Sequence, residues 1–66
     1  MRALVNGEEW ELAEGATVHD VLMRMGMPST GVAVARGGEV VPRATWAVTA
    51  LREGDRVEVL TAVQGG

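Results

Sequence analysis

The dipeptide Asn6-Gly7 constrains the fold of this sequence more than any other feature. It stands between two stretches with apolar residues, and both central positions of a type I′ β-turn need the positive φ that Asn and Gly tolerate best. A two-residue turn fixes the strand pairing, with Val5 opposite Glu8 and Arg2 opposite Glu11. The sequence therefore opens on an antiparallel hairpin of known register, in which Arg2 and Glu11 form a favourable cross-strand pair.

This register also decides which side chains share a face of the hairpin. Alternation along a strand sends neighbouring side chains to opposite faces. One face carries mostly apolar side chains, those of Met1, Ala3, Val5, Trp10 and Leu12. The opposite face carries Arg2, Leu4, Glu9 and Glu11. Only the first face is therefore expected to pack against a core.

The residues after the Glu14-Gly15 turn have the pattern of a short amphipathic helix. Thr17 stands three residues before Asp20, a capping-box-like pair that starts a helix. Gly26 lies where a helix-terminating glycine belongs, and Pro28 blocks continuation. Between these signals runs one apolar stripe at helical spacing, made of Val18, Val21, Leu22 and Met25. We expect this helix to form only when the stripe is docked on a sheet.

The middle of the chain predicts a second pair of strands. Residues 31–35 alternate with β-branched valines and are typical of a strand. Gly37-Gly38 then forms a two-residue turn, and residues 40–41 form a short returning strand that ends at Pro42.

The last third of the chain predicts an irregular crossover and a final strand. Residues 42–51 lack a clear period and contain one short turn of helix, anchored by Trp46 and Leu51. Residues 53–55 form a turn. The alternation over residues 56–63 then places Val57, Val59, Thr61 and Val63 on one face of a strand.

The order of these elements is hairpin, helix, strand, short strand, irregular crossover and final strand. One helix across one face of a mixed sheet is an α+β two-layer design, and this order matches the β-grasp (ubiquitin-like) fold, with four to five strands and one main helix. A chain of 66 residues builds one core and no second lobe. We expect a single β-grasp domain over residues 1–63 and a flexible C-terminal diglycine tail over residues 64–66.

Composition argues against several kinds of function. Without cysteine, the chain builds neither a disulfide framework nor a thiolate metal site. The net charge of −3 and the scattered arginines differ from the basic patch of a nucleic-acid-binding protein. No apolar run approaches the ~20 residues of a membrane span, and no signal-peptide pattern opens the sequence. We expect a cytoplasmic protein that binds neither nucleic acid nor membrane and is a monomer when free.

No catalytic constellation stands out in the folded part of the sequence. His19 is the only histidine, and it falls on the polar side of the helix without a second ligand at metal spacing. The hairpin carboxylates read as a solvated rim because neither burial nor a charge partner is evident; they belong to Glu8, Glu9, Glu11 and Glu14. We therefore predict no catalytic residue, no metal ligand and no cofactor bound by this chain, which acts as a substrate or carrier or only binds.

The outer face of the predicted sheet carries apolar residues. Once the valines of the final strand face the helix, Leu4, Leu60 and Ala62 lie on the opposite face, with one alternate set from residues 31–35. A sheet covered by a helix on one side only is usually polar where it meets water. These residues form either a small docking patch for a partner or leucines that are exposed without a role, and both interpretations stay open.

The sequence finishes on Gln64-Gly65-Gly66, directly after the final strand. Glycines remove Cβ clashes, adopt backbone angles closed to other residues and let another backbone approach closely. These properties suit a segment threaded into the active site of a partner, with the Gly66 carboxylate as the reactive group. The alternative is an interaction module with a frayed end.

The stretch 40–55, VVPRATWAVTALREGD, combines Val-Pro-Arg, Trp46 and a Glu-Gly-Asp turn before the last strand. The strand leading into Asn6, the Gly15-x-Thr17-Val18 start of the helix and the final Gly65-Gly66 complete a pattern that covers the whole chain. In these features the sequence resembles the ThiS family, the sulfur carrier proteins of thiamine biosynthesis.

This resemblance implies a chemistry for the tail. The Gly66 carboxylate would attack the α-phosphate of ATP on an adenylyltransferase of the ThiF type, giving an acyl-adenylate and pyrophosphate. A sulfur donor, such as a cysteine desulfurase, would then replace AMP and leave a thiocarboxylate. Thiazole synthase, of the ThiG type, would receive that sulfur. The chain would be a co-substrate of these enzymes and not an enzyme itself.

Two other functions remain compatible with the sequence. The chain could be a sulfur carrier of another pathway, as the small subunit of molybdopterin synthase or in tRNA thiolation. It could also be a ubiquitin-like modifier, whose Gly66 would form isopeptide bonds with lysines of target proteins. Val-Pro-Arg with Trp46 favours the thiamine branch.

Overall fold

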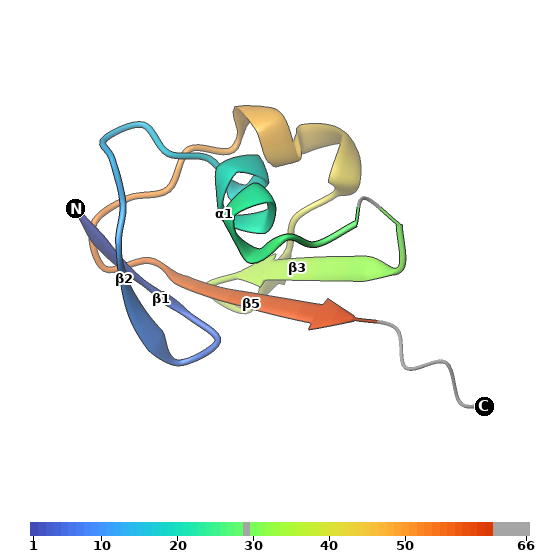
Figure 1. The fold of residues 1–66 in the computed structure, drawn as a ribbon, viewed down its shortest axis with the longest axis horizontal. Helices are drawn as coiled ribbons and strands as arrows, with labels where there is room; N and C mark the ends of the chain where they lie inside the picture. Colours follow the sequence, from blue (N-terminus) through green and yellow to red (C-terminus); the bar gives the residue numbers. More distant parts are fainter. Residues whose placement is uncertain (29, 62–66) are drawn as a thin grey trace.

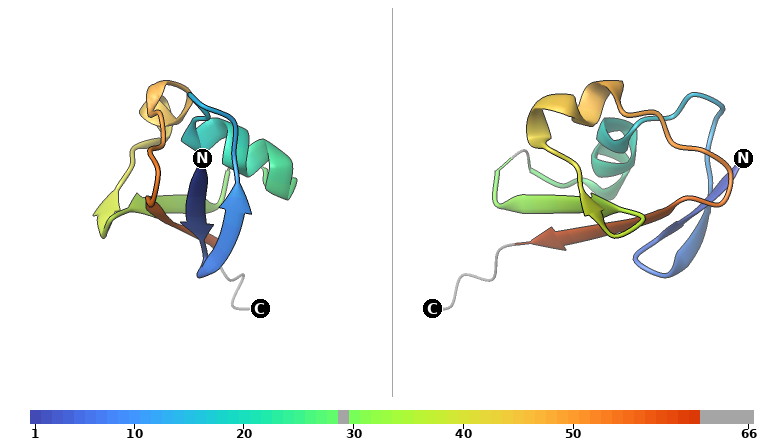
Figure 2. Two further views of the ribbon diagram at one scale, coloured as in Figure 1. Left: turned by 90° about the vertical axis from the view of Figure 1, so that its left-hand side faces the viewer. Right: turned by 180° about the vertical axis from the view of Figure 1, so that it is seen from behind.

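The computed structural model describes residues 1–28 and 30–61. Its elements are β1 (Arg2–Val5), β2 (Glu8–Glu11), α1 (Val18–Met25), β3 (Val32–Arg36), β4 (Glu39–Val40), the 3₁₀ helix η1 (Arg43–Val48) and β5 (Arg56–Thr61). The five strands form one mixed sheet in the order β2-β1-β5-β3-β4. Helices α1 and η1 lie together on one side of this sheet (Figures 1 and 2). The predicted α+β β-grasp architecture is confirmed, with five strands and one main helix.

The first hairpin has the predicted register. Arg2 pairs with Glu11 and Val5 with Glu8, and the turn residue Asn6 has a φ of 51°. The Arg2 guanidinium lies 3.3 Å from a Glu11 carboxylate oxygen, as the cross-strand pairing predicts. Of the face predicted to be apolar, Ala3, Val5 and Leu12 are buried, while Met1 and Trp10 are half-buried against the core.

Helix α1 starts and ends at the predicted signals. The Thr17 hydroxyl accepts a hydrogen bond from the Asp20 N–H at 3.2 Å, and the Asp20 carboxylate accepts one from the Thr17 N–H at 2.9 Å. Gly26 terminates the helix at a φ of 72°, and its N–H bonds the carbonyls of the last turn. Of the predicted stripe, Val18, Val21 and Leu22 are buried and Met25 is half-buried.

The second pair of strands is displaced by one residue from the predicted ranges. β3 runs through Arg36 and β4 begins at Glu39, because the turn at Gly37-Gly38 pairs these two residues directly. Both glycines have positive φ, 58° and 86°, as a two-residue hairpin turn requires. The structure thereby confirms the turn and extends the strands up to it.

The irregular crossover contains the expected short helix and its two anchors. Trp46 in η1 and Leu51 after it are both buried in the core. The Trp46 indole N–H donates to the Val41 carbonyl at 2.9 Å, so this large side chain is buried with its polar atom satisfied. The Leu51 N–H bonds the Ala16 carbonyl at 2.8 Å, which ties the crossover to the start of α1.

Strand β5 lies at the centre of the sheet. It pairs parallel with β1 and antiparallel with β3, where Val34 lies level with Val59. Val57 and Val59 are buried under the helices, and Glu58 and Leu60 are exposed on the outer face, as the alternation predicts. Strands β1, β3 and β5 and helices α1 and η1 contribute buried side chains to one core, whose least exposed side chains are Val18, Val21, Val34 and Val57. The predicted end of the strand at Val63 and the predicted tail, 64–66, lie outside the described residues.

Candidate functional site

The outer face of the sheet is left uncovered by the described elements, because both helices lie on the other side (Figure 2). Leu60 on β5 is 62% exposed and Val40 on β4 is 76% exposed. The register sets Ala33 level with Leu60 and Ala35 level with Val40. Since residues two apart on a strand share a face, these side chains form an apolar strip across β5, β3 and β4. We call these four residues, Leu60, Ala33, Ala35 and Val40, the outer apolar strip.

Leu60 and Ala33, at one end of the outer apolar strip, lie near the end of β5, from which the sequence continues to Gly66. A hollow of about 330 Å³ adjoins the strip, lined by Gly31, Val32, Ala33, Leu60 and Thr61. The exposed Leu60 side chain borders this hollow from the strand, so the two features form one surface. A flat apolar surface of this kind is typical of a site that docks another protein.

The predicted docking residues are distributed unevenly over this face. Leu60 is part of the outer apolar strip, whereas Leu4 is half-buried on β1 and level with Arg56. Glu58 lies between them along β5, so charged residues separate the two leucines. Ala62 lies outside the described residues. The docking role of Leu4, Leu60 and Ala62 stays a prediction, and the register adds Ala33, Ala35 and Val40 to the surface.

The carboxylates of the first hairpin are engaged in local interactions. Glu8 accepts a hydrogen bond from the Trp10 indole at 3.0 Å, and Glu9 lies 3.4 Å from the Arg2 guanidinium. Glu11 bridges Arg2 and the Met1 ammonium, which it approaches at 3.6 Å. All these carboxylates are exposed, so the interactions are worth little individually. The Arg2–Glu11 pair follows from the predicted register, and the structure adds the contacts of Glu8 with Trp10, of Glu9 with Arg2 and of Glu11 with the Met1 ammonium.

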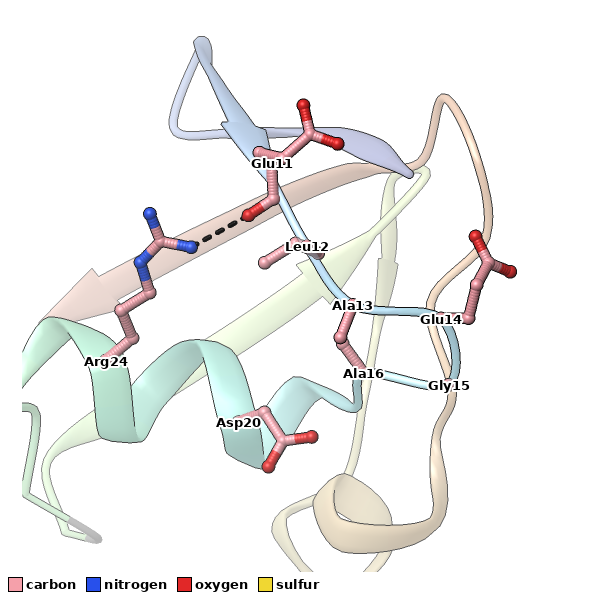
Figure 3. A pocket seen from close by; sticks show the side chains of 8 residues that line it. All are labelled: Glu11, Leu12, Ala13, Glu14, Gly15, Ala16, Asp20 and Arg24. Carbon is pink, nitrogen blue, oxygen red and sulfur yellow. Dashed lines mark hydrogen bonds between the residues drawn. The ribbon is translucent and has the colours of Figure 1, made fainter.

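A hollow of about 270 Å³ lies between this hairpin and α1 (Figure 3). Its eight lining residues are Glu11, Leu12, Ala13, Glu14, Gly15, Ala16, Asp20 and Arg24. The Arg24 guanidinium reaches across it and donates to the Glu11 carbonyl at 2.9 Å (Figure 3). The Asp20 carboxylate is bonded to the Thr17 N–H. Arg24 therefore connects α1 to the hairpin, and Asp20 caps the start of α1.

His19 is exposed on α1 at the edge of a smaller hollow of about 130 Å³. The other lining residues are apolar: Leu22, Met23, Met27, Pro28 and Trp46. In the described part of the chain, no three histidine, aspartate or glutamate side chains come together as a metal site. Nor does either described helix have the length and apolarity needed to cross a membrane.

The residues predicted to carry the chemistry, Gln64, Gly65 and Gly66, lie outside the described part of the chain. The structure places one end of the outer apolar strip near the end of β5, from which these residues follow in sequence. Sequence periodicity placed Leu60 on the outer face. Only the β3–β4 register adds Val40, because a strand of two residues has no period of its own.

Comparison with known proteins places these features in context. The sequence model described as the ThiS family matches residues 1–66. The sulfur carrier protein ThiS of Escherichia coli is 32% identical over 66 residues, which cover all of both chains. A thiazole synthase of Paramagnetospirillum magneticum is 36% identical over 66 residues, and a thiazole synthase of Magnetococcus marinus shows the same identity. The chain spans only 20% of the length of each of these two synthases.

A solved structure supports the same relationship. The crystal structure of the thiamine biosynthesis protein ThiS from Geobacter metallireducens matches with a TM-score of 0.82 and 32% identity, over all of both chains. The solution structure of the Geobacter protein matches with a TM-score of 0.81. The order of strands and helices described above is therefore shared with this protein.

Proposed function

The chain belongs to the ThiS family, and from this premise we propose that it is a sulfur carrier of thiamine biosynthesis. The observation that carries the proposal is the match to the sulfur carrier ThiS of Escherichia coli, which covers the full length of both chains. The Geobacter ThiS structure, matched over all of both chains, supports it. A carrier role is also consistent with the described domain, in which the charged groups of the first hairpin form local hydrogen bonds and ion pairs and the outer apolar strip is exposed.

In the proposed reaction the Gly66 carboxylate is the group that changes. A carboxylate oxygen attacks the α-phosphorus of ATP on a ThiF-type adenylyltransferase, and pyrophosphate leaves. A persulfide on the sulfur donor then displaces AMP from the acyl-adenylate, and a thiol reduces the acyl disulfide so formed, which leaves a thiocarboxylate and a disulfide. Adenylation is needed because a free carboxylate is a poor electrophile, and AMP supplies the leaving group. ATP is bound by the partner, so the chain itself holds no cofactor in this scheme.

Gly65 and Gly66 let the reactive carboxylate reach an active site on another protein. Side chains at these positions would have to fit the same channel, and glycine also adopts backbone angles closed to other residues. A flexible segment loses entropy when it is bound, and docking of the rigid domain offsets that cost. In this scheme the outer apolar strip supplies the docking and Gln64-Gly65-Gly66 supply the reach.

The proposed acceptor of the sulfur is a thiazole synthase. In two relatives named thiazole synthase, a region similar to this whole chain makes up 20% of a longer polypeptide. A carrier and its acceptor joined in one chain act together at high effective concentration. We extend this pairing to the present chain, with the ThiF-type enzyme and a cysteine desulfurase as further partners. Because the scheme depends on ATP and on these enzymes, it implies a cytoplasmic co-substrate and not an enzyme.

The experiment that tests this function is intact-mass spectrometry. The protein is incubated with ATP, a ThiF-type adenylyltransferase and a sulfur donor, and then weighed. We expect a mass gain equal to the exchange of one carboxylate oxygen for sulfur. The matched control deletes Gly66 and leaves the described domain unchanged, and it should show no gain.

Three results would count against the proposal. If an adenylyltransferase that is active on its own carrier leaves the mass of this chain unchanged, the carrier function is wrong. If adducts with lysines of other proteins form instead, the chain is a modifier. A deletion strain that grows without added thiamine would show that the pathway is a different one.

A further inference from the structure

Asn6 makes contacts that its role in the hairpin turn does not require. Its side-chain oxygen Oδ1 accepts a hydrogen bond from the Val59 N–H at 2.8 Å. Its side-chain nitrogen Nδ2 donates to the Val59 carbonyl at 3.3 Å. The Asn6 backbone N–H also donates to the Val57 carbonyl at 2.9 Å. One turn residue of the first hairpin therefore forms hydrogen bonds with two residues of the central strand β5, Val57 and Val59.

The geometry of the sheet explains why Val59 bonds to a side chain and not to the backbone of β1. β1 pairs with β5 only over Leu4 and Val5, because the chain turns away into β2 at Asn6. The carbonyls of Asp55, just before β5, and of Val57 accept hydrogen bonds from Leu4 and Asn6, so every second residue points its backbone groups to that side. Val59 is the next residue in this series, and no backbone of β1 extends far enough to meet it.

The Asn6 amide replaces the missing peptide group. A side-chain amide carries one C=O acceptor and an NH₂ donor, which match the N–H and C=O of Val59. On the other side of β5, Val34 lies level with Val59 but gives its carbonyl to the Val41 N–H. Asn6 is thus the contact that satisfies Val59 after β1 has ended.

Val59 stands near the point where the chain leaves the described sheet. Thr61 is the last residue of β5, and Gly66 is seven positions after Val59. Beyond Val59, the first hairpin no longer lies beside β5 on the β1 side. We propose that Asn6 is a positioning residue, whose amide fixes Val59 in β5 and so holds the part of the sheet from which the sequence continues to Gly66.

This role rests on the proposed sulfur-carrier function. The outer apolar strip and the Gly66 carboxylate must engage one partner at the same time. The position at which the chain leaves the sheet therefore affects how the carboxylate is presented to that partner. Misplacement of a reacting group by about 1 Å can lower a rate on the order of a hundredfold. Loss of the Asn6 amide frees Val59 on the β1 side, while β3 still holds Leu60 and Thr61 and with them the docking surface. The expected effect is therefore on the rate of adenylation and not on docking.

Two variants of Asn6 separate the amide from the turn. Asn6→Gly keeps the positive φ of the turn, which glycine adopts freely, and removes the amide. Asn6→Asp keeps an acceptor for the Val59 N–H but places a carboxylate oxygen against the Val59 carbonyl. The control is Thr17→Ala, which destabilises α1 in the helical layer and removes no hydrogen-bond partner of β5.

The first measurement is amide hydrogen exchange of the free protein. In Asn6→Gly we expect the Val59 N–H to exchange at least about tenfold faster, as local opening allows. The amides of Glu58 and Leu60, which the alternation of the strand turns toward β3 and away from Asn6, should change far less. In Thr17→Ala the exchange rate of the Val59 N–H should change only as far as the global free energy of unfolding changes. An unchanged Val59 rate in Asn6→Gly would overturn the inference.

The second measurement is adenylation kinetics with the ThiF-type partner. We expect kcat to fall on the order of tenfold in both Asn6 variants, with KM unchanged within about twofold because docking is retained. Thr17→Ala should keep the wild-type kcat. If Asn6→Gly also keeps it, the positioning role is wrong. If the wild-type protein is not adenylated at all, the sulfur-carrier function and the positioning role fail together, while the Val59 exchange rate still decides whether Asn6 holds the strand.

Discussion

At the scale of single residues, two short motifs set the limits of the helix. Thr17 and Asp20 satisfy each other's backbone N–H groups, and Gly26 takes the left-handed conformation that ends α1. The helix has only eight residues, too few to be stable alone in water. Each terminal residue therefore contributes a large share of what keeps α1 formed.

The first residue-scale prediction concerns the N-cap. Thr17→Ala removes the hydroxyl that accepts from the Asp20 N–H, so we expect the free energy of unfolding to fall by about 1 kcal/mol. Urea denaturation measures this loss. Thr17→Ser keeps the hydroxyl and is the matched control. An equal loss in both variants would show that the hydroxyl is not the cause.

The second residue-scale prediction concerns the C-terminal end of α1. A Cβ added at Gly26 would meet no atom within 4 Å, so the cost of Gly26→Ala comes only from its φ of 72°. We expect a loss of about 1 kcal/mol in the same denaturation assay. Gly26→Asn should lose less, because Asn tolerates the left-handed region. A larger loss for Asn than for Ala would contradict this explanation.

At the scale of elements, one side chain ties α1 to the first hairpin. The Arg24 guanidinium carbon lies 4.5 Å from the centre of the Trp10 ring, and Nη1 donates to the Glu11 carbonyl. Both contacts reach β2, the edge strand of the sheet. Neither was predicted from the sequence, because Trp10 and Arg24 belong to separate elements whose distance is set by their packing on the core.

The prediction at this scale is a measurable coupling between the two residues. In a double-mutant cycle with Arg24→Ala and Trp10→Leu, we expect a coupling free energy of about 0.5–1 kcal/mol. Chemical denaturation of the four proteins gives this value. Arg36→Ala, on β3 and three strands away from β2, is the control partner for Trp10→Leu and should show no coupling. Equal coupling in both cycles would contradict the contact.

At the scale of the whole molecule, the two faces differ in what covers them. The inner face of the sheet is covered by α1 and η1 (Figure 2). The outer face presents the outer apolar strip. Exposed apolar side chains occur on both sides, since Met23 on α1 is 65% exposed. The proposed docking depends on position relative to the end of β5, and not on exposed apolar area as such.

A matched pair of substitutions tests this dependence. Leu60→Arg and Met23→Arg each add one positive charge at an exposed apolar position, on opposite faces. Both should leave the unfolding free energy within about 0.5 kcal/mol of wild type. We expect Leu60→Arg to weaken binding to the ThiF-type partner about tenfold, and Met23→Arg to change it less than about twofold. Titration calorimetry distinguishes the two, and the opposite order would place the docking site on the helical face.

Much of the fold follows from residues whose effect is local. Asn6-Gly7 fixes a hairpin register, Thr17 and Gly26 bound a helix, and alternation in β5 assigns Val57 to the core. These features can be predicted from the sequence because turns, caps and strand periods depend on residues a few positions apart. The strand limits at Arg36 and Glu39 were missed by one residue, because the strands continue up to the turn itself.

The sequence by itself determined the hairpin, the helix, the alternation of the final strand and the family pattern that points to Gly66. The tertiary structure alone decided which strands lie side by side. That arrangement separates Leu4 from Leu60 by charged residues, brings Ala33 and Val40 into one strip, and joins Asn6 to Val59. Asn6 and Val59 are 53 positions apart. Contacts at such separations depend on how the whole core packs, and no local propensity encodes them.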